Sequence, residues 1–165
     1  AEGRDAALAW AKGVTANMAR PPQGNDRDQV RSVALGLGEL AVVNTYYLGL
    51  LENADDPKDR AARAAVGVIF PNQSDRGAHV NVSGAGIVKG AKNRPHAVAL
   101  LEFLTSKKIQ ASYQKMTSEF AVAEGIKPEP LQAKWGTFKP DLTSLHELAG
   151  HQEEAVKIFD LAGWK

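Results

Sequence analysis

The sequence predicts an α/β fold with a mostly parallel sheet. Segments with helical periodicity alternate along the chain with short apolar runs rich in β-branched residues, and glycine, proline or polar residues separate the two. Such short apolar runs are typical of buried parallel strands, and their alternation with helices is typical of an α/β architecture. The strands are few for 165 residues, since we count about three where a sheet usually has five or six. Part of the sheet is therefore expected to lie outside this chain.

Each element is predicted from its own signals. Asn25 or Asp26 can cap one helix, Asn44 or Thr45 another, and Pro57 suits the first turn of a third. Apolar spacing predicts helices at residues 5–18, 27–35, 45–51, 55–65, 95–104, 106–116, 128–135 and 152–161. We expect buried strands at 39–44 and 66–70, an alternating extended segment at 78–88, irregular chain or a short strand at 118–126, and mostly loop at 140–148.

Composition bounds the function. Hydrophobic residues make up 44% and charged residues 24% of the chain, as in an ordinary globular protein. The net charge of +1 gives no electrostatic signal for nucleic acid, and no apolar run approaches the roughly 20 residues of a membrane span. The absence of cysteine excludes disulfides and thiolate ligands. Because the chain does not begin with Met and shows no signal peptide, we expect a processed product or a fragment.

Two adjacent tyrosines, Tyr46 and Tyr47, follow the predicted strand at 39–44, and only Tyr113 lies elsewhere. In open α/β sheets, ligands bind beyond the carboxyl ends of the strands, where helix N-termini also point. On the first turn of a helix the two side chains can converge on one point outside the sheet. Phenolate is a hard oxygen donor, and a phenol with a pKa near 10 needs a strong Lewis acid such as Fe(III) to ionise at neutral pH.

Simpler interpretations stay open at this stage. The two tyrosines can equally be packing residues with hydrated hydroxyl groups. The four histidines have no metal-ligand spacing, and His79 suits a structural hydrogen bond better. The segment Ser83–Gly86 lacks the continuation of a phosphate-binding loop, and no nucleophile-elbow pattern is present. We therefore expect a binding protein and not an enzyme.

The residues around the tyrosine pair resemble the periplasmic ferric-iron-binding proteins of ABC transporters. The matching stretches keep their order over the whole chain: WAKGVTANMARPPQGND (10–26), VNTYY (43–47), FPNQ (70–73), HVNVSGAG (79–86), WGTFKPD (135–141) and AVKIFD (155–160). The resemblance implies a class II solute-binding fold of two lobes that close over one Fe(III). It also implies a periplasmic location and an inner-membrane ABC permease as partner.

The resemblance assigns site residues. Tyr46 and Tyr47 match the consecutive iron ligands of the family. Asn44 matches a residue that contacts a synergistic anion, carbonate or another, in some members. Arg20, Asn25 and Asp26 match a loop near the same cleft and are candidates for the anion or outer shell.

The length of the chain implies that it is half of a longer protein, since family members are about twice as long. We expect the C-terminal half, with residues 1–77 and 128–165 in the C-terminal lobe and 78–127 crossing the hinge into a partial N-terminal lobe. The absent N-terminal half, or a swapped second copy, would then cover the exposed faces. Two departures from the family are Glu119–Val122, where a Tyr-Pro pair is usual, and Leu50, often basic in relatives. The alternatives are a related module for an anion or small organic ligand, or a hydrolase using the same cleft.

Overall fold

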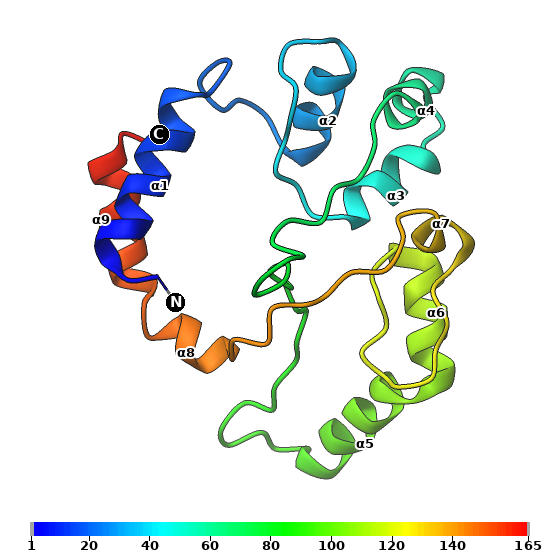
Figure 1. Ribbon diagram of the computed structural model, residues 1–165. Coiled ribbons are helices and arrows are strands. Elements are labelled where there is room, and N and C mark those ends of the chain that lie inside the picture. The colour runs from blue at the N-terminus through cyan, green and yellow to red at the C-terminus, as the bar shows by residue number, and fades with distance from the viewer. Residues whose placement is uncertain (1, 165) are drawn as a thin grey trace. The chain divides into compact units, whose positions relative to one another are not determined.

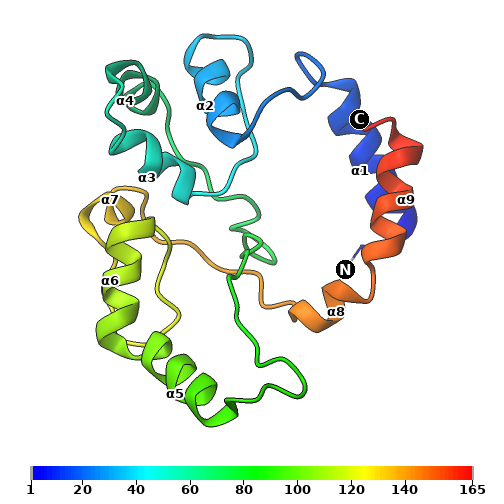
Figure 2. The ribbon, with the colours of Figure 1, turned by 180° about the vertical axis from the view of Figure 1, so that it is seen from behind.

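The computed structural model describes residues 2–164 and contains nine helices within that range, joined by long irregular segments (Figure 1). The same chain seen from behind shows α1 beside α9, and α2 near α3 and α4 (Figure 2). The helices are α1 (Arg4–Ala16), α2 (Asp26–Ala34), α3 (Tyr46–Glu52), α4 (Pro57–Ala64), α5 (Arg94–Thr105), α6 (Lys107–Thr117), α7 (Pro130–Ala133), α8 (Leu145–Ala149) and α9 (Gln152–Ala162). All eight helices expected from the sequence are present.

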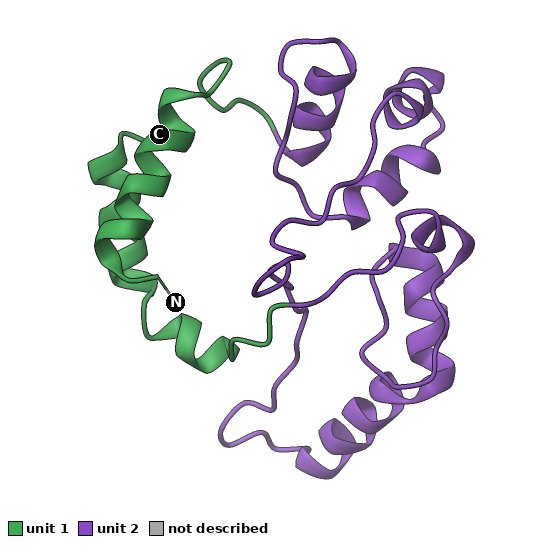
Figure 3. Ribbon diagram, in the orientation of Figure 1, with its two compact units in different colours: residues 1–24, 141–165 green, residues 25–140 purple. Residues whose placement is uncertain are grey.

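The chain divides into two compact units, one of residues 1–24 and 141–165 and one of residues 25–140 (Figure 3). The boundaries of these units differ from the lobe boundaries expected from the sequence, which stay a prediction. In the part of the chain that the structure describes, no helix is both long and apolar enough to cross a membrane.

The smaller unit is a pair of helices, α1 and α9, with α8 leading into α9. Ala11 and Ile158 are its buried residues, and Trp10 stacks on Trp164 with ring centroids 6.1 Å apart. The Arg4 guanidinium Nε donates to the Glu154 carboxylate at 2.6 Å. This ion pair is exposed, so it contributes little to stability, and the apolar contacts hold the unit together.

The larger unit has its core under α2, α3 and α7. Four buried side chains form the core: Val30, Leu48, Leu51 and Trp135. Partly buried apolar side chains pack around them: Val43, Val66, Val68, Phe70, Phe120 and Leu131. Two buried leucines on α3 fix the orientation of that helix, and they lie in the turns that follow the tyrosine pair.

The predicted strands at 39–44 and 66–70 are wrong as strands. No strand is assigned within residues 2–164, and the isolated parallel bridge between Ala78 and Pro140 is all that forms in the 78–88 segment. A strand needs a hydrogen-bonded neighbour, and these segments pair with nothing in the described chain. Burial alternates along 66–70, where Val68 packs on the core and Ile69 next to it is 77% exposed. In 39–44 it does not alternate, and Val42 is 96% exposed. Neither segment is therefore the fully buried strand that the sequence predicts.

A second correction concerns residues 140–148, which were expected to be mostly loop. Helix α8 begins there, and the Ser144 side chain caps it by accepting a hydrogen bond from the Glu147 backbone N–H at 3.1 Å. Serine followed three residues later by glutamate is the capping-box signature. The sequence therefore carried a helix-start signal that apolar spacing alone did not show.

Residues 71–78 and 139–140 are tied together beside the bridge. The Gln73 side chain accepts from the Lys139 backbone N–H at 2.7 Å and donates to the Lys139 carbonyl at 3.2 Å. Gly77 lies between them with φ 96°, and a Cβ there would meet the Lys139 carbonyl oxygen at 2.6 Å. Only glycine fits this close approach. The two segments therefore cross at one fixed point.

Candidate metal centre

Tyr46 and Tyr47 are the first two residues of α3. Thr45 is the N-cap residue but makes no side-chain cap, and the Tyr47 backbone N–H instead donates to the Asn44 carbonyl at 3.2 Å. Both tyrosines are half-buried, and their ring centroids lie 4.4 Å apart with 38° between the planes. Successive residues on a helix point about 100° apart. The two rings nevertheless lie together, as the position at a helix start led us to expect.

The surroundings of Tyr46 favour its protonated form. The pKa of the Tyr46 phenol is raised, first by a hydrogen bond with the Tyr47 side chain, then by burial, and then by the negative charges of Tyr47, Asp26 and Glu119. A proton or another cation between these groups relieves the repulsion. The local field is therefore suited to bind positive charge.

Asp26 lies on one side of the pair. It is the first residue of α2, and its carboxylate accepts a hydrogen bond from the Asn44 backbone N–H at 3.4 Å. This contact brings the start of α2 to the residues that precede α3. Asn44 and Asp26, two candidates from the sequence, are thus neighbours of the phenols.

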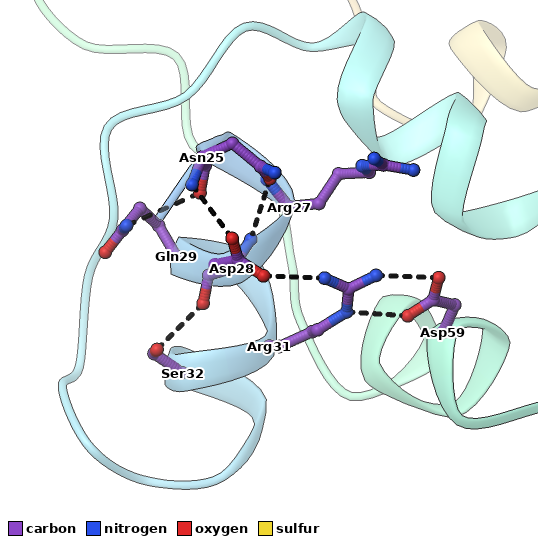
Figure 4. Close-up of polar contacts among 7 residues, drawn as sticks. All are labelled: Asn25, Arg27, Asp28, Gln29, Arg31, Ser32 and Asp59. Carbon is purple, nitrogen blue, oxygen red and sulfur yellow. Dashed lines mark hydrogen bonds and ion pairs between the residues drawn. The ribbon is translucent and has the colours of Figure 1, made fainter. Parts of the chain in front are cut away.

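Asn25 has a structural role that explains its place in the sequence (Figure 4). Its side-chain oxygen accepts from the backbone N–H of Arg27 at 2.9 Å and of Asp28 at 3.3 Å, and the Asp28 carboxylate accepts from the Asn25 N–H at 2.9 Å. This is a complete capping box, which fixes where α2 begins. Asn25 therefore positions Asp26, its neighbour.

A bidentate ion pair fastens α2 to α4 (Figure 4). The Arg31 guanidinium contacts both oxygens of Asp59, at 2.7 and 2.8 Å, and also Asp28 at 2.7 Å. Hydrogen bonds with Arg31 lower the pKa of Asp59, and the pKa of Asp28 is lowered first by the Asn25 backbone and then by Arg31. The carboxylates are thereby held in their charged form, and α2 is held in place beside the site.

Arg20, the remaining candidate, lies in the other compact unit. Its guanidinium donates to the Pro21 carbonyl at 3.1 Å. Its part in anion binding stays a prediction.

The chain that follows α6 contributes a further charge near Tyr46, and no site residue is predicted there from the sequence. Ser118 ends α6 in the left-handed conformation, with φ 61°, and Glu119 follows it. Glu119 is one of the charges that raise the pKa of Tyr46. The sequence marked Glu119 only as a departure from the family pattern, so no local signal linked it to the tyrosines.

The arrangement offers oxygen donors. No group of three or more histidine, cysteine, aspartate or glutamate residues that could hold a metal occurs among the described residues. Two phenols with carboxylates nearby form a different donor set, hard and anionic when ionised. Such a set prefers a hard, highly charged cation.

Comparison with solved structures identifies the fold of the chain. No protein-family model matches the chain. A ferric binding protein from Campylobacter jejuni superimposes with a TM-score of 0.93 and 41% identity, covering 99% of this chain and 52% of that one. A Trichodesmium protein solved in complex with iron and citrate gives a TM-score of 0.95 and 40% identity, again covering 99% and 52%. The chain thus has the fold of about half of a class II solute-binding protein, as the resemblance implies.

The curated relatives are iron uptake proteins. Iron uptake protein A1 of Synechocystis is 47% identical over 165 residues, which is 100% of this chain and 46% of that protein. Iron uptake protein A2 of the same organism is 37% identical over 158 residues. The chain is thus similar over nearly its whole length to iron uptake and ferric-iron-binding proteins, as its resemblance implied. It spans about half the length of the curated relatives it matches.

Proposed function

We propose that this chain is the C-terminal half of the Fe(III)-binding component of an iron uptake ABC transporter, with Tyr46 and Tyr47 as phenolate ligands. The observation that carries the proposal is the phenol pair itself, with rings 4.4 Å apart at the start of α3, in a chain similar to iron uptake proteins. Binding replaces the phenol protons by the metal, since a trivalent cation stabilises phenolate far better than a proton does at neutral pH.

The surroundings of the pair support an oxygen-rich iron site. Asn44 and Asp26 lie beside the phenols, and Asn25 fixes the start of α2 that carries Asp26. A synergistic anion, carbonate or a small carboxylate, would fill positions that the protein leaves open. The Trichodesmium relative was solved with iron and citrate, which gives a small carboxylate a precedent in a related protein.

In this proposal the protein captures Fe(III) and delivers it to the permease, and it catalyses no reaction. The periplasm is the compartment in which such a component meets its inner-membrane permease. The cleft would close over the ion and open at the permease, where the ion is released.

Helices α5 and α6 expose apolar side chains that another polypeptide would cover. Phe103 is 57% and Met116 is 77% exposed, and both line a cavity of about 270 Å³ with Leu104, Ile109, Ser112 and Tyr113. Large exposed apolar patches mark interaction sites. We assign this face to the N-terminal half of the same protein, or to a swapped second copy when that half is absent; light scattering of the purified chain separates monomer from dimer.

The test of the proposed function is Fe(III) affinity, measured by competition with nitrilotriacetate in the presence of bicarbonate. The Y46F/Y47F variant should lose binding, because phenylalanine keeps the rings and removes both donor oxygens. The matched control is Y113F, which removes the remaining phenol and should bind as the wild type does. Equal affinity of Y46F/Y47F and Y113F would refute the ligand assignment.

A second candidate function keeps the fold and changes the ligand to an anion or small organic molecule. The Trichodesmium citrate complex is the observation that favours it. Intact-mass measurement under native conditions, before and after dialysis against a chelator, separates the two. Loss of about one iron mass supports the proposed function, whereas an organic mass that survives the chelator supports the alternative.

A further inference from the structure

Glu119 is held at a fixed place by its backbone. It follows Ser118, the left-handed residue that ends α6, and its N–H donates to the Thr117 hydroxyl at 3.2 Å. The Gln132 side-chain amide, 1% exposed, donates to the carbonyls of both Ser118 and Glu119, at 3.1 and 2.8 Å. A buried amide that binds two successive carbonyls leaves this turn little freedom. The Glu119 side chain therefore starts from a well-determined point.

That point lies against α3. Gly49 packs so closely on Ser118 that a Cβ at position 49 would overlap both the Cβ and the hydroxyl oxygen of Ser118. Gly49 comes three residues after Tyr46 on the same helix, and residues at that spacing share a helix face. The contact between Gly49 and Ser118 thus sets the residue just before Glu119 against the face of α3 that carries Tyr46.

The side chain of Glu119 is engaged only lightly by the protein. It is half-buried, and its Oε1 accepts a hydrogen bond from the exposed Ser83 hydroxyl at 3.3 Å. Asp26, the other carboxylate that acts on Tyr46, accepts from the Asn44 backbone. A half-buried carboxylate with one long hydrogen bond retains capacity to accept another positive partner.

We propose that Glu119 supplies a carboxylate oxygen to the cation bound by Tyr46 and Tyr47. The inference rests on the proposed function and adds a protein donor to it. Two phenolates and one carboxylate match the three positive charges of Fe(III). Each phenol gives its proton to solvent as the metal binds, so charge balances without a further anion. Iron binding by this chain should accordingly depend less on bicarbonate than a site built from the two phenolates alone.

The test compares wild type with E119Q and with E124Q, a matched control at an exposed glutamate in the turn that follows. Fe(III) affinity is measured with nitrilotriacetate competition, with and without bicarbonate. E119Q should bind at least about tenfold more weakly and depend more on bicarbonate, whereas E124Q should match wild type. The tyrosinate charge-transfer band of E119Q should also move to longer wavelength, because losing an anionic donor makes the iron a stronger electron acceptor. Circular dichroism checks that the three proteins fold alike.

The E119D variant separates ligation from packing. It keeps the carboxylate one methylene further back, so the band should stay near its wild-type position while part of the affinity is lost. Equal losses in E119Q and E119D with an unshifted band would mean a structural role and would overturn the inference, as would E119Q binding as tightly as E124Q. In either of those cases Y46F/Y47F still tests the proposed function by itself. A wild-type chain without a tyrosinate band would refute that function, and this inference with it.

Discussion

The phenol pair is flanked by two regions that are built in different ways. On one side the start of α2 carries Asp26 and is fixed by local devices, namely the capping box of Asn25 and the ion pair of Arg31 with Asp59. On the other side the end of α6 carries Glu119 and is fixed by close packing on Gly49 and by one buried amide. The first region depends on local hydrogen bonds and a partly buried ion pair, and the second on close packing of buried residues.

The region around Asp26 and the region around Glu119 should therefore tolerate different substitutions. The ion pair of Arg31 with Asp59 is partly exposed on the Arg31 side, and Arg31 keeps Asp28 as a second partner, so its loss should be partly compensated. An interior contact without spare volume cannot adjust, so even one added methyl group is felt. The Glu119 side should therefore be the more sensitive to small substitutions, although it carries fewer polar contacts.

The largest expected effect on stability comes from Gly49→Ala. The added methyl overlaps Ser118 Cβ as well as its hydroxyl oxygen, so rotating the hydroxyl does not relieve the clash. Overpacking of this kind lowers the free energy of unfolding by about 1–3 kcal/mol. Better helix propensity offsets up to about 1 kcal/mol of that, so a net loss is expected. Urea unfolding monitored by circular dichroism measures it.

Two further variants check the cause of that loss. In G49A/S118G both overlapping atoms are gone, and glycine suits the left-handed backbone at position 118, so stability should recover. Gly13→Ala is the matched control, since Gly13 is also inside a helix and a Cβ there meets nothing within 4 Å. G13A should stabilise the chain slightly. A G49A chain as stable as wild type would show that α3 and the end of α6 are not in close contact.

A smaller effect is expected from Asp59→Asn on the α2 side. The change removes the charge from a bidentate contact with Arg31 but leaves Arg31 paired with Asp28. The melting temperature should fall by a few degrees at neutral pH. Asp55→Asn, at an exposed position before α4, serves as the control and should leave the melting temperature unchanged.

The same variant predicts a pH dependence. The pKa of Asp59 is lowered in the folded chain, so its contribution to stability is full above its ordinary value of about 3.9 and is lost as the pH falls through the lowered value. The difference in melting temperature between wild type and D59N should therefore be largest at neutral pH and vanish in strong acid. A difference that grows on acidification would contradict the role given to this ion pair.

Sequence and structure agree where the determinants are local. The start of α2 at Asn25, the proline at the start of α4 and the tyrosine pair at the start of α3 were all visible as short patterns. The cap of α8 at Ser144 is an equally local signal, although apolar spacing alone does not show it. Such signals need no knowledge of distant residues.

Features that depend on contacts between distant residues could be found only in the three-dimensional structure. The segments at 39–44 and 66–70 have strand-like apolar content, yet pairing depends on neighbours that the described chain does not provide. The contact of Gly49 with Ser118 joins residues that are far apart in sequence, and neither residue has an unusual local context. Glu119 could not be placed near Tyr46 until that contact was known.

The central claim is that Tyr46 and Tyr47 bind ferric iron, and the visible spectrum of the chain with Fe(III) and bicarbonate tests it most directly. The account predicts a tyrosinate-to-iron charge-transfer band that persists in Y113F and disappears in Y46F/Y47F. A band that survives in Y46F/Y47F would contradict it.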